Sequence, residues 1–426
     1  MGGVDAKGKI ALNRPELMQL HRPLKILLLI SDTGGGHRSA AQALAEGLHA
    51  RLGDRVQPVI VDLITDHTFW PLNQIRYTYR PMVNDALWLW RALWRLGERP
   101  LVVGAIGPVF APLTYRPVSA YFRQQNPDLV VTVHPLINHA ALRILRRAGL
   151  RAPFATVVTD LVTAPIAWFN PQADLCCVPT EAARQRALRY RMPPHKVVVT
   201  GMPVSLKFNV PEVNQEQRVA MRRQLGLHPE LPTVLIVSGG EGMGPVEAIA
   251  VAVAGRLAGT APRTAPQGQI VVICGRNRDL QRRLAARAWP TPVSIQGFVT
   301  NMPDWMMASD CIVTKAGPGT ITEALIMGLP LVLSGFVPGQ ETGNVPYVVD
   351  NRVGAYAEDP AQIARIVAEW LQPGNEELAK MKARARALVR PDASLVIADH
   401  LLTLVPTPES SASAAWKSRA LPLYER

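Results

Sequence analysis

The chain has 426 residues, too many for one ordinary hydrophobic core, so we expect two domains. Hydrophobic residues make up 48% of it, which indicates a globular protein and excludes an intrinsically disordered one. The net charge is +13, and residues 1–205 carry most of it, because they hold 24 of the 46 basic but only 13 of the 33 acidic residues. A basic first half favours an anionic polymer or an anionic membrane as partner.

Cysteine usage and targeting signals indicate the compartment. Four cysteines lie in apolar, strand-like stretches, and their spacing fits neither a metal site nor a disulfide, so we expect buried thiols in a reducing compartment. No signal peptide is visible, and we expect no transmembrane helix, because glycines and prolines interrupt the apolar run 100–115. We therefore expect a peripheral protein on the cytoplasmic face of a membrane. The cysteines are Cys176, Cys177, Cys274 and Cys311.

The first half begins as a doubly wound domain. After a flexible tail, 1–22, the run 25–30 is typical of a buried parallel strand. A glycine-rich loop follows at 31–37, and a helix is expected from about residue 39 to 50. Strand, glycine loop and helix in this order predict a Rossmann-like domain, which we place at 23–205. The loop lacks the dinucleotide fingerprint, so NAD is not expected.

His37 is the candidate catalytic residue. It follows three glycines at a helix start, on the carboxyl side of the first strand. Glycines let a bulky acceptor approach the backbone, and an imidazole can take a proton from a hydroxyl group. We favour a general base over the alternative, a histidine that only caps the helix.

Arginines and tryptophans are interleaved between residues 69 and 123. On a helix, Leu87, Trp90 and Trp94 would share one face, with Arg91 and Arg95 beside it. This composition suits a membrane interface, and the alternatives are an arginine-edged core helix and a surface that stacks on single-stranded nucleic acid. The expected membrane-docking residues are Trp88, Trp90, Arg91, Trp94 and Arg95.

Later in this half, polar side chains follow the ends of expected strands. His134, Asp160 and Trp168 lie just past such ends, where ligand-facing residues of parallel sheets gather. Each of them has a structural role as its alternative reading. For His139 we favour the structural role.

The second half repeats the opening of the first. After a linker, 206–230, a strand at 233–237 leads into a second glycine-rich loop, 238–245, and then a helix. We place a second domain at 231–390, a helix that crosses back to the first domain at 391–405, and a flexible tail at 406–426. Arg276 follows another strand, where it either neutralises a diphosphate or is a solvated loop residue.

The stretch 308–344 predicts the donor site. A strand leads into the turn Gly317-Pro318-Gly319, a helix is expected to start at Thr320, and the exposed amides of a helix start suit a phosphate. The alternative is a capping box, in which Thr320 and Glu323 only satisfy backbone groups. A loop with Gln340, Glu341 and Asn344 follows the next strand and brings polar groups to the same rim.

The segments SDTGGGHRSAA, VHPLINHA, VVTDLVTAPIAWF, TGMPV, GPGTITEA and PGQETGNVP resemble the monogalactosyldiacylglycerol synthase family. These are inverting GT-B glycosyltransferases, and the resemblance spans about residues 24–404. It implies two Rossmann-like α/β domains facing an interdomain cleft, with His37 as the base. It also implies that Glu323 holds the ribose, Gln340 and Glu341 read the sugar hydroxyls, Asn344 supports their rim, and Phe298 lies near the uracil. The implied donor-side set is Gly240, Gly275, Arg276, Phe298, Gly319, Thr320, Glu323, Gln340, Glu341 and Asn344; the acceptor-side set is Gly35, Gly36, His134, Asp160, Trp168 and Pro203.

The expected reaction transfers a hexose from a UDP-sugar to the sn-3 hydroxyl of 1,2-diacylglycerol with inversion; galactose is favoured, and glucose stays open as the alternative sugar. We expect no cofactor and no metal, because amides and Arg276 can meet the diphosphate charge. The expected partners are the UDP-sugar, diacylglycerol and an anionic phospholipid surface, without nucleic acid. Two alternatives stay open: a polyprenyl-linked-sugar transferase or UDP-sugar 2-epimerase on the same fold, and a non-catalytic anionic-lipid or nucleic-acid binder.

Overall fold

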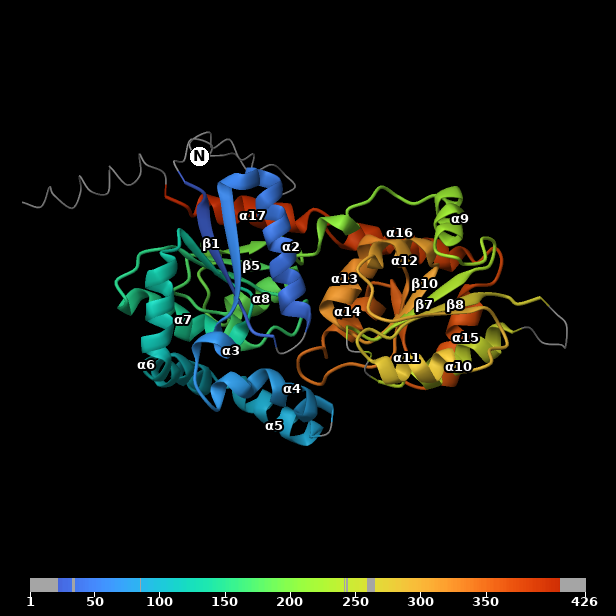
Figure 1. Ribbon diagram of the computed structural model, residues 1–426, viewed down its shortest axis with the longest axis horizontal. Helices are drawn as coiled ribbons and strands as arrows, with labels where there is room; N and C mark the ends of the chain where they lie inside the picture. The colour runs from blue at the N-terminus through green and yellow to red at the C-terminus, as the bar shows by residue number, and fades with distance from the viewer. Residues whose placement is uncertain are drawn as a thin grey trace, which may run out of the picture.

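The computed structural model describes residues 22–32, 35–84, 86–240, 242, 244–258 and 265–406. Within them the chain forms two lobes, each built on a six-stranded parallel sheet (Figure 1). The expected tails, 1–22 and 406–426, lie outside the described residues except for their inner ends. Parts of the two expected glycine-rich loops, 31–37 and 238–245, lie outside them too, as do residues 259–264.

The first sheet has the strand order β2-β1-β3-β4-β5-β6. Side chains of β1 alternate between its faces: Leu28 packs with α2 (Gly35–Leu52), and Leu27 packs with α7 (Pro135–Arg147). Both faces are therefore covered, as the continuous apolar run indicates. The strands are β1 (Leu24–Ile30), β2 (Val56–Asp62), β3 (Leu129–Thr132), β4 (Phe154–Val157), β5 (Leu175–Val178) and β6 (Val197–Val199).

The second sheet has the order β12-β11-β10-β7-β8-β9. One face is covered by α10 (Val246–Leu257) and α15 (Pro360–Trp370), and the other by α12 (Met302–Ala308) and α13 (Pro318–Ile326). Alternate strand residues again feed the two cores. The strands are β7 (Thr233–Val237), β8 (Gln269–Ile273), β9 (Val293–Gln296), β10 (Cys311–Thr314), β11 (Leu331–Leu333) and β12 (Gly354–Tyr356).

Strand order reverses once in each sheet, between β1 and β3 and between β7 and β10. Ligands of open parallel sheets bind at the carboxyl ends of the strands beside such a reversal. In the first lobe this point carries the loops before His37 and His134. In the second it carries the 238–245 loop and the turn before α13. The helices α2 and α13 that start there contact each other across the two lobes (Figure 1).

The last described helix, α17 (Ala393–Thr403), completes the core of the first lobe. Its apolar side chains join the cluster around Leu28 and Leu44, and Arg51 of α2 pairs with Asp399 at 2.7 Å. The two helices cross closely at Gly47, where any side chain would meet the carbonyl oxygen of Ser394. The chain therefore returns from the second lobe to the first, as Figure 1 shows.

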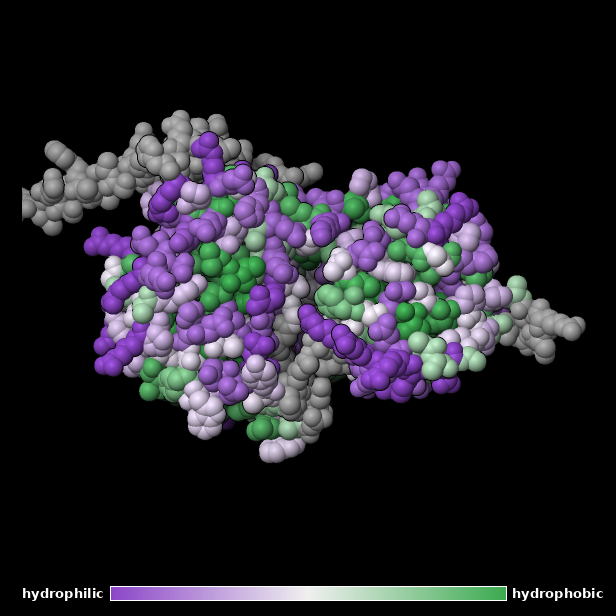
Figure 2. All heavy atoms as spheres, viewed as in Figure 1, coloured by the Kyte–Doolittle hydropathy of each residue, from purple (hydrophilic) through white to green (hydrophobic). Residues whose placement is uncertain are grey.

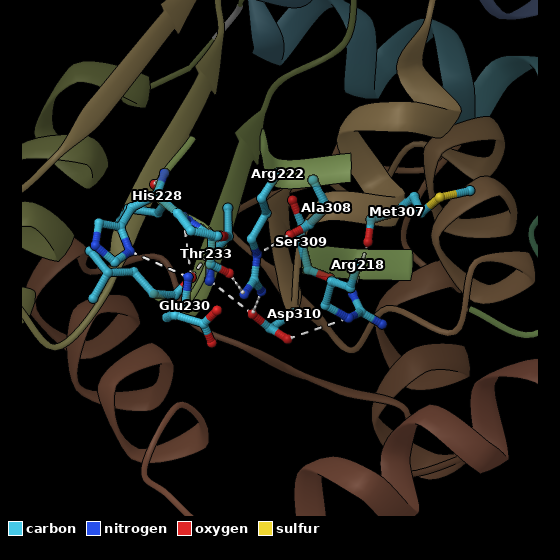
Figure 3. Close-up of polar contacts among 12 residues, drawn as sticks. Arg218, Arg222, His228, Glu230, Thr233, Met307, Ala308, Ser309 and Asp310 are labelled. Atoms are coloured by element: carbon cyan, nitrogen blue, oxygen red, sulfur yellow. Dashed lines mark hydrogen bonds and ion pairs between the residues drawn. The ribbon is translucent and has the colours of Figure 1, made fainter. Parts of the chain in front are cut away.

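The segment 206–230 is fixed to the second lobe by buried arginines. Its helix α9 (Gln215–Gln224) packs on α12, and Arg222, which is fully buried, donates to the carbonyl of Ala308 and to Asp310 at 2.6 Å (Figure 3). Asp310 also accepts the backbone N–H of Thr233 at 2.8 Å, at the start of β7. One carboxylate thus joins the segment to the first residues of two central strands.

Four helices separate β2 from β3, namely α3 (Leu63–His67), α4 (Ile75–Asn84), α5 (Leu87–Gly97) and α6 (Pro100–Gln125). The expected interruption of 100–115 is wrong, because α6 continues through Pro108, Pro112 and Pro117. A proline removes one backbone hydrogen bond, and packing on α3 and α7 keeps the helix formed. Helix α6 is also long and apolar enough to span a membrane. Core helices of soluble proteins can have the same length and hydropathy.

Candidate functional site

His37 lies in the first turn of α2, directly past the carboxyl end of β1. Its Nδ1 is 3.2 Å from the hydroxyl of Thr159, and its ring hydrogen-bonds the carbonyl of Val133. Burial lowers the pKa of His37 to about 4, so the ring is neutral at physiological pH. A neutral ring that donates one N–H keeps a lone pair on the other nitrogen, as a general base requires.

Three residues expected to face the acceptor are buried in the first lobe, and two of them pack near His37. The ring of His134 packs edge-on against His37 with 4.5 Å between centroids, and Trp168 lies 6.2 Å away. Trp168 donates its indole N–H to Asp160 at 2.6 Å. All three of these side chains are buried. Gly35 and Gly36 are exposed at the start of α2, and side chains built there would meet no atom of the described residues within 4 Å beyond their own helix.

Asp160 links this support to the second lobe. Its carboxylate accepts hydrogen bonds from Trp168 and from the side-chain amide of Gln340. Burial nevertheless raises the pKa of Asp160 to about 6, because desolvation outweighs these two bonds. Trp168, Asp160 and Gln340 are therefore linked by hydrogen bonds, and the Trp168 ring in turn packs near His37.

The donor side contains two loops in tight contact. Gly275 has φ +58°, and a Cβ there would lie 2.4 Å from the carbonyl oxygen of Gly240, so only glycine fits this approach. The backbone N–H of Arg276 donates to the same carbonyl at 2.8 Å. The Arg276 guanidinium stacks over the Phe298 ring at 4.7 Å, and both side chains are exposed. The structure thus brings together four residues that the sequence assigned to the donor.

The start of α13 differs from the sequence prediction. The helix begins at Pro318 with Gly317 as N-cap, and no side chain caps it, which rules out the capping box of Thr320 and Glu323. Gly319 has no neighbouring atom within 4 Å of where a side chain would begin, so the first turn is open to a ligand. Glu323 is partly exposed, and burial raises its pKa to about 7.

The loop after β11 is held by its own polar side chains. The buried Glu341 accepts from Lys315 Nζ at 2.6 Å and from the backbone N–H of Val337 at 2.8 Å. Asn344, also buried, donates to the carbonyl of Ala316 at 2.9 Å and begins α14 (Asn344–Asp350). Lys315 is a functional candidate that the sequence analysis missed, although a cation directly past β10, at the strand-order reversal, was a signal for it.

The first lobe touches this loop at three further points. Thr163 accepts the backbone N–H of Gly343 at 2.7 Å, and Trp90 donates its indole N–H to the carbonyl of Pro338 at 2.8 Å. Trp94 lies over Gly339. We call the segment between β11 and α14, residues 334–343, the donor loop. Trp90 and Trp94, which the sequence predicted to face lipid, are instead half-buried against this loop.

Pro203, also expected on the acceptor side, is buried where the chain crosses between the lobes. The two residues that follow it bond to α17 and to α2. Val204 pairs with Ser394 at the start of α17, and Ser205 donates to Glu46 in the middle of α2. Its segment therefore connects the lobes.

Large apolar side chains are exposed along the helices that precede β3. Trp88 is 73% exposed, Trp70 75% and Leu101 89%, and Arg91 and Arg95 are exposed beside them. Part of this surface lies at the lower edge of Figure 2, where α4 and α5 run in Figure 1. The exposed apolar side chains here are Phe69, Trp70, Tyr77, Trp88, Leu89, Leu93, Leu96, Leu101, Val109 and Leu113.

Comparisons with known proteins match both lobes. A family model described as "Monogalactosyldiacylglycerol (MGDG) synthase" matches residues 37–204, and one described as "Glycosyltransferase family 28 C-terminal domain" matches residues 233–394. A probable chloroplastic monogalactosyldiacylglycerol synthase of Nicotiana tabacum is 43% identical over 90% of this chain and 71% of its own length. Monogalactosyldiacylglycerol synthase 1 of Arabidopsis thaliana is 40% identical over 95% of this chain and 75% of its own length.

Solved structures agree on the architecture. MurG of Acinetobacter baumannii superposes with a TM-score of 0.57 at 18% identity, over 89% of this chain and 100% of its own. A UDP-GlcNAc 2-epimerase from Neisseria meningitidis, bound to UDP-GlcNAc, gives 0.56 at 15% identity, over 89% and 100%. At such identities the likeness shows the fold alone. That fold is GT-B, two parallel α/β domains, as the sequence predicted.

Proposed function

The chain belongs to the monogalactosyldiacylglycerol synthase family, and from this membership we propose that it transfers galactose from UDP-galactose to the sn-3 hydroxyl of 1,2-diacylglycerol. The observation that carries the proposal is the continuous chain of contacts from His37 through Trp168 and Asp160 to Gln340. This chain of contacts supports a single transfer site, in which a neutral His37 acts near the polar loop that carries Gln340.

His37 acts on the acceptor. The acceptor oxygen forms a bond to C1 of the sugar while the bond from C1 to the UDP oxygen breaks, and the configuration at C1 inverts. The hydroxyl proton passes to the ring nitrogen of His37 that carries no hydrogen, and the lowered pKa keeps the ring neutral until then. Gly35 and Gly36 leave room at the helix start for the glycerol backbone.

The donor is held by groups of the second lobe. The open first turn of α13 and the cations Lys315 and Arg276 face the charge that develops on the departing diphosphate. Phe298 offers an exposed ring for the uracil, and Glu323 a carboxylate for the ribose. We propose that these protein groups stabilise the leaving UDP without a resident cofactor.

The acceptor is a membrane lipid, so the protein must reach a bilayer. We propose that it docks peripherally, from the cytoplasmic side, on anionic phospholipid. The exposed apolar side chains around Trp88 would enter the interface, while Arg91 and Arg95 would meet anionic head groups. The four buried, unpaired cysteines suit a reducing compartment.

A product assay tests the reaction. Thin-layer chromatography of diacylglycerol incubated with the protein should show a galactolipid with UDP-galactose, and weaker or no product with UDP-glucose. Conversion of UDP-GlcNAc without any acceptor would identify an epimerase instead and contradict the proposal.

Vesicle flotation tests the docking surface. The protein should float with vesicles that contain phosphatidylglycerol and remain at the bottom with phosphatidylcholine alone. Replacing Trp88 by Ala, or Arg91 and Arg95 by Gln, should reduce flotation. Unchanged flotation of both variants would remove this surface from the membrane contact.

A further inference from the structure

Helix α5 touches the donor loop directly, although it belongs to the first lobe. Trp90 Nε1 donates to the Pro338 carbonyl at 2.8 Å. The Trp94 ring covers Gly339 so closely that a Cβ at this position would lie 2.6 Å from ring carbons. The two indoles also pack on each other, with 5.8 Å between their centroids. They contact Pro338 and Gly339, the two residues that immediately precede Gln340.

The contacts of the two tryptophans fix the backbone of the donor loop next to its polar residues. Gly339 has φ +87°, a left-handed conformation, and its N–H donates to the Thr342 hydroxyl at 2.8 Å. Farther along, Gly343 is held by Thr163 of the first lobe. Gln340 and Glu341 therefore lie between two contacts made by the other lobe, one from α5 and one from the segment after β4.

The far end of α5 is anchored in the first lobe. Glu98, its C-cap, pairs with Arg186 of α8 (Glu181–Arg189) and accepts from the Tyr190 hydroxyl at 3.2 Å. Leu89, Leu93 and Leu96 share another side of α5, roughly 110° round the helix from Trp90 and Trp94, and all three are exposed. Helix α5 therefore connects an exposed apolar surface to the donor loop.

We propose that Trp90 and Trp94 are positioning residues for the donor sugar, and that a lipid surface under the exposed face of α5 favours the position in which they hold the loop. The inference rests on the proposed function for the identity of the sugar and the surface. Lipid then tightens UDP-galactose binding. Because binding linkage is reciprocal, UDP-galactose must tighten vesicle binding by the same factor.

The test measures affinity rather than turnover. Calorimetry on the full chain should give affinities for UDP-galactose and for UDP, with and without vesicles of phosphatidylcholine and phosphatidylglycerol. Trp90→Phe removes the indole N–H and keeps a ring, and it should weaken UDP-galactose by roughly 3- to 10-fold while UDP changes little. Trp94→Ala should do the same, and Trp94→Phe should restore most of the affinity. Both weakened variants should lose the gain that vesicles give the wild type.

A matched control is available in the second lobe. Trp289 also donates its indole N–H to a backbone carbonyl, that of Leu284 at 3.0 Å, but in the loop before β9. Trp289→Phe should leave the ratio of UDP-galactose to UDP affinity at the wild-type value. Equal weakening of both ligands by Trp90→Phe and Trp94→Ala, or no weakening of either, would overturn the inference.

Two further results separate this inference from the function on which it rests. A wild-type protein that makes galactolipid but binds UDP-galactose equally with and without vesicles would overturn the lipid coupling alone. A wild-type protein that binds UDP-galactose but makes no galactolipid would overturn the proposed function, and the role of the two tryptophans in sugar binding would still be decided by the affinity ratio.

Discussion

Asp160 in the first lobe accepts a hydrogen bond from the side chain of Gln340 in the second lobe, so this bond connects the two lobes. The same carboxylate holds Trp168, which packs behind His37. A GT-B enzyme must bring its two domains together before transfer, because acceptor and donor are bound by different lobes. The bond between Asp160 and Gln340 therefore belongs to an arrangement in which the proposed base, His37, and the proposed sugar-binding residue Gln340 are already linked through Trp168 and Asp160.

Replacing His37 by Ala should abolish turnover and leave the donor site intact. Removing a general base costs roughly 10²- to 10⁴-fold in rate, and within the described residues His37 hydrogen-bonds Thr159 and Val133, which are not among the groups expected to hold UDP. Steady-state kinetics should show the loss in kcat, with UDP affinity unchanged in calorimetry. Normal turnover of the variant would show that another group takes the proton.

The pH dependence of catalysis should reflect Asp160 rather than His37. Burial lowers the pKa of His37 to about 4, so it stays a base at higher pH, whereas the pKa of Asp160 is raised to about 6. As the pH falls through about 6, protonation weakens the bond that Asp160 accepts from Gln340, and kcat/KM should fall with it. Asp160→Asn cannot titrate and should lose this acid limb, which a pH–rate profile would show.

The same shift predicts an effect on stability. Because the folded pKa of Asp160 lies above the ordinary value of 3.8, its stabilising contribution is complete below that value and is lost as the pH rises through about 6. The unfolding free energy of the Asp160→Asn variant, minus that of the wild type, should therefore be larger at pH 8 than at pH 3.5. The two differences should differ by as much as about 3 kcal/mol. Denaturant titrations at both pH values measure this, and equal differences at the two would contradict it.

The sequence predicted the two sheets well, because buried parallel strands are continuous apolar runs that end in glycine or polar residues. The run 25–30 and the stretch 308–344 show this pattern clearly. It failed at α6, where glycines and prolines were interpreted as interruptions although packing on α3 and α7 keeps the helix continuous. Helix propensity is local, and this packing involves residues distant in the chain.

The sequence predicted individual residues of the candidate site, but it did not predict which of them contact each other. Strand ends indicated His134, Asp160 and Trp168, yet only the structure shows that they lie behind His37. Helical spacing placed Trp90 and Trp94 on one face, but it could not show that the donor loop covers that face. Contacts between lobes leave no periodic signal in either partner, so the bonds of Thr163 and Asp160 to the donor loop were not foreseen.

Lys315 and Glu341 should act as a coupled pair in donor binding. Their 2.6 Å ion pair fixes the carboxylate in the loop that we propose to bind the sugar and keeps the ammonium near Gly317 at the start of α13. Glu341→Ala should weaken UDP-galactose more than UDP, and Lys315→Ala should weaken both, because it also removes a cation near the diphosphate. The double variant should lose less than the two losses combined, with a coupling of about 1–3 kcal/mol from affinities measured in a double-mutant cycle. Strict additivity would show that the pair does not act jointly at the donor.

Asp310 should be a major determinant of the stability of the second lobe, without a role in the reaction. It neutralises Arg222, which is fully buried, and accepts the backbone N–H of Thr233, while Arg218 and Lys382 lie within 4 Å of the same carboxylate (Figure 3). Asp310→Ala leaves these cations without their anion, and losing one partner of a buried pair costs about 3–5 kcal/mol. Denaturant unfolding should show this loss, whereas Asp279→Ala, which breaks a fully solvated pair with Arg282, should change stability by less than about 0.5 kcal/mol. Equal effects of the two substitutions would mean that α9 is not held to the sheet by this carboxylate.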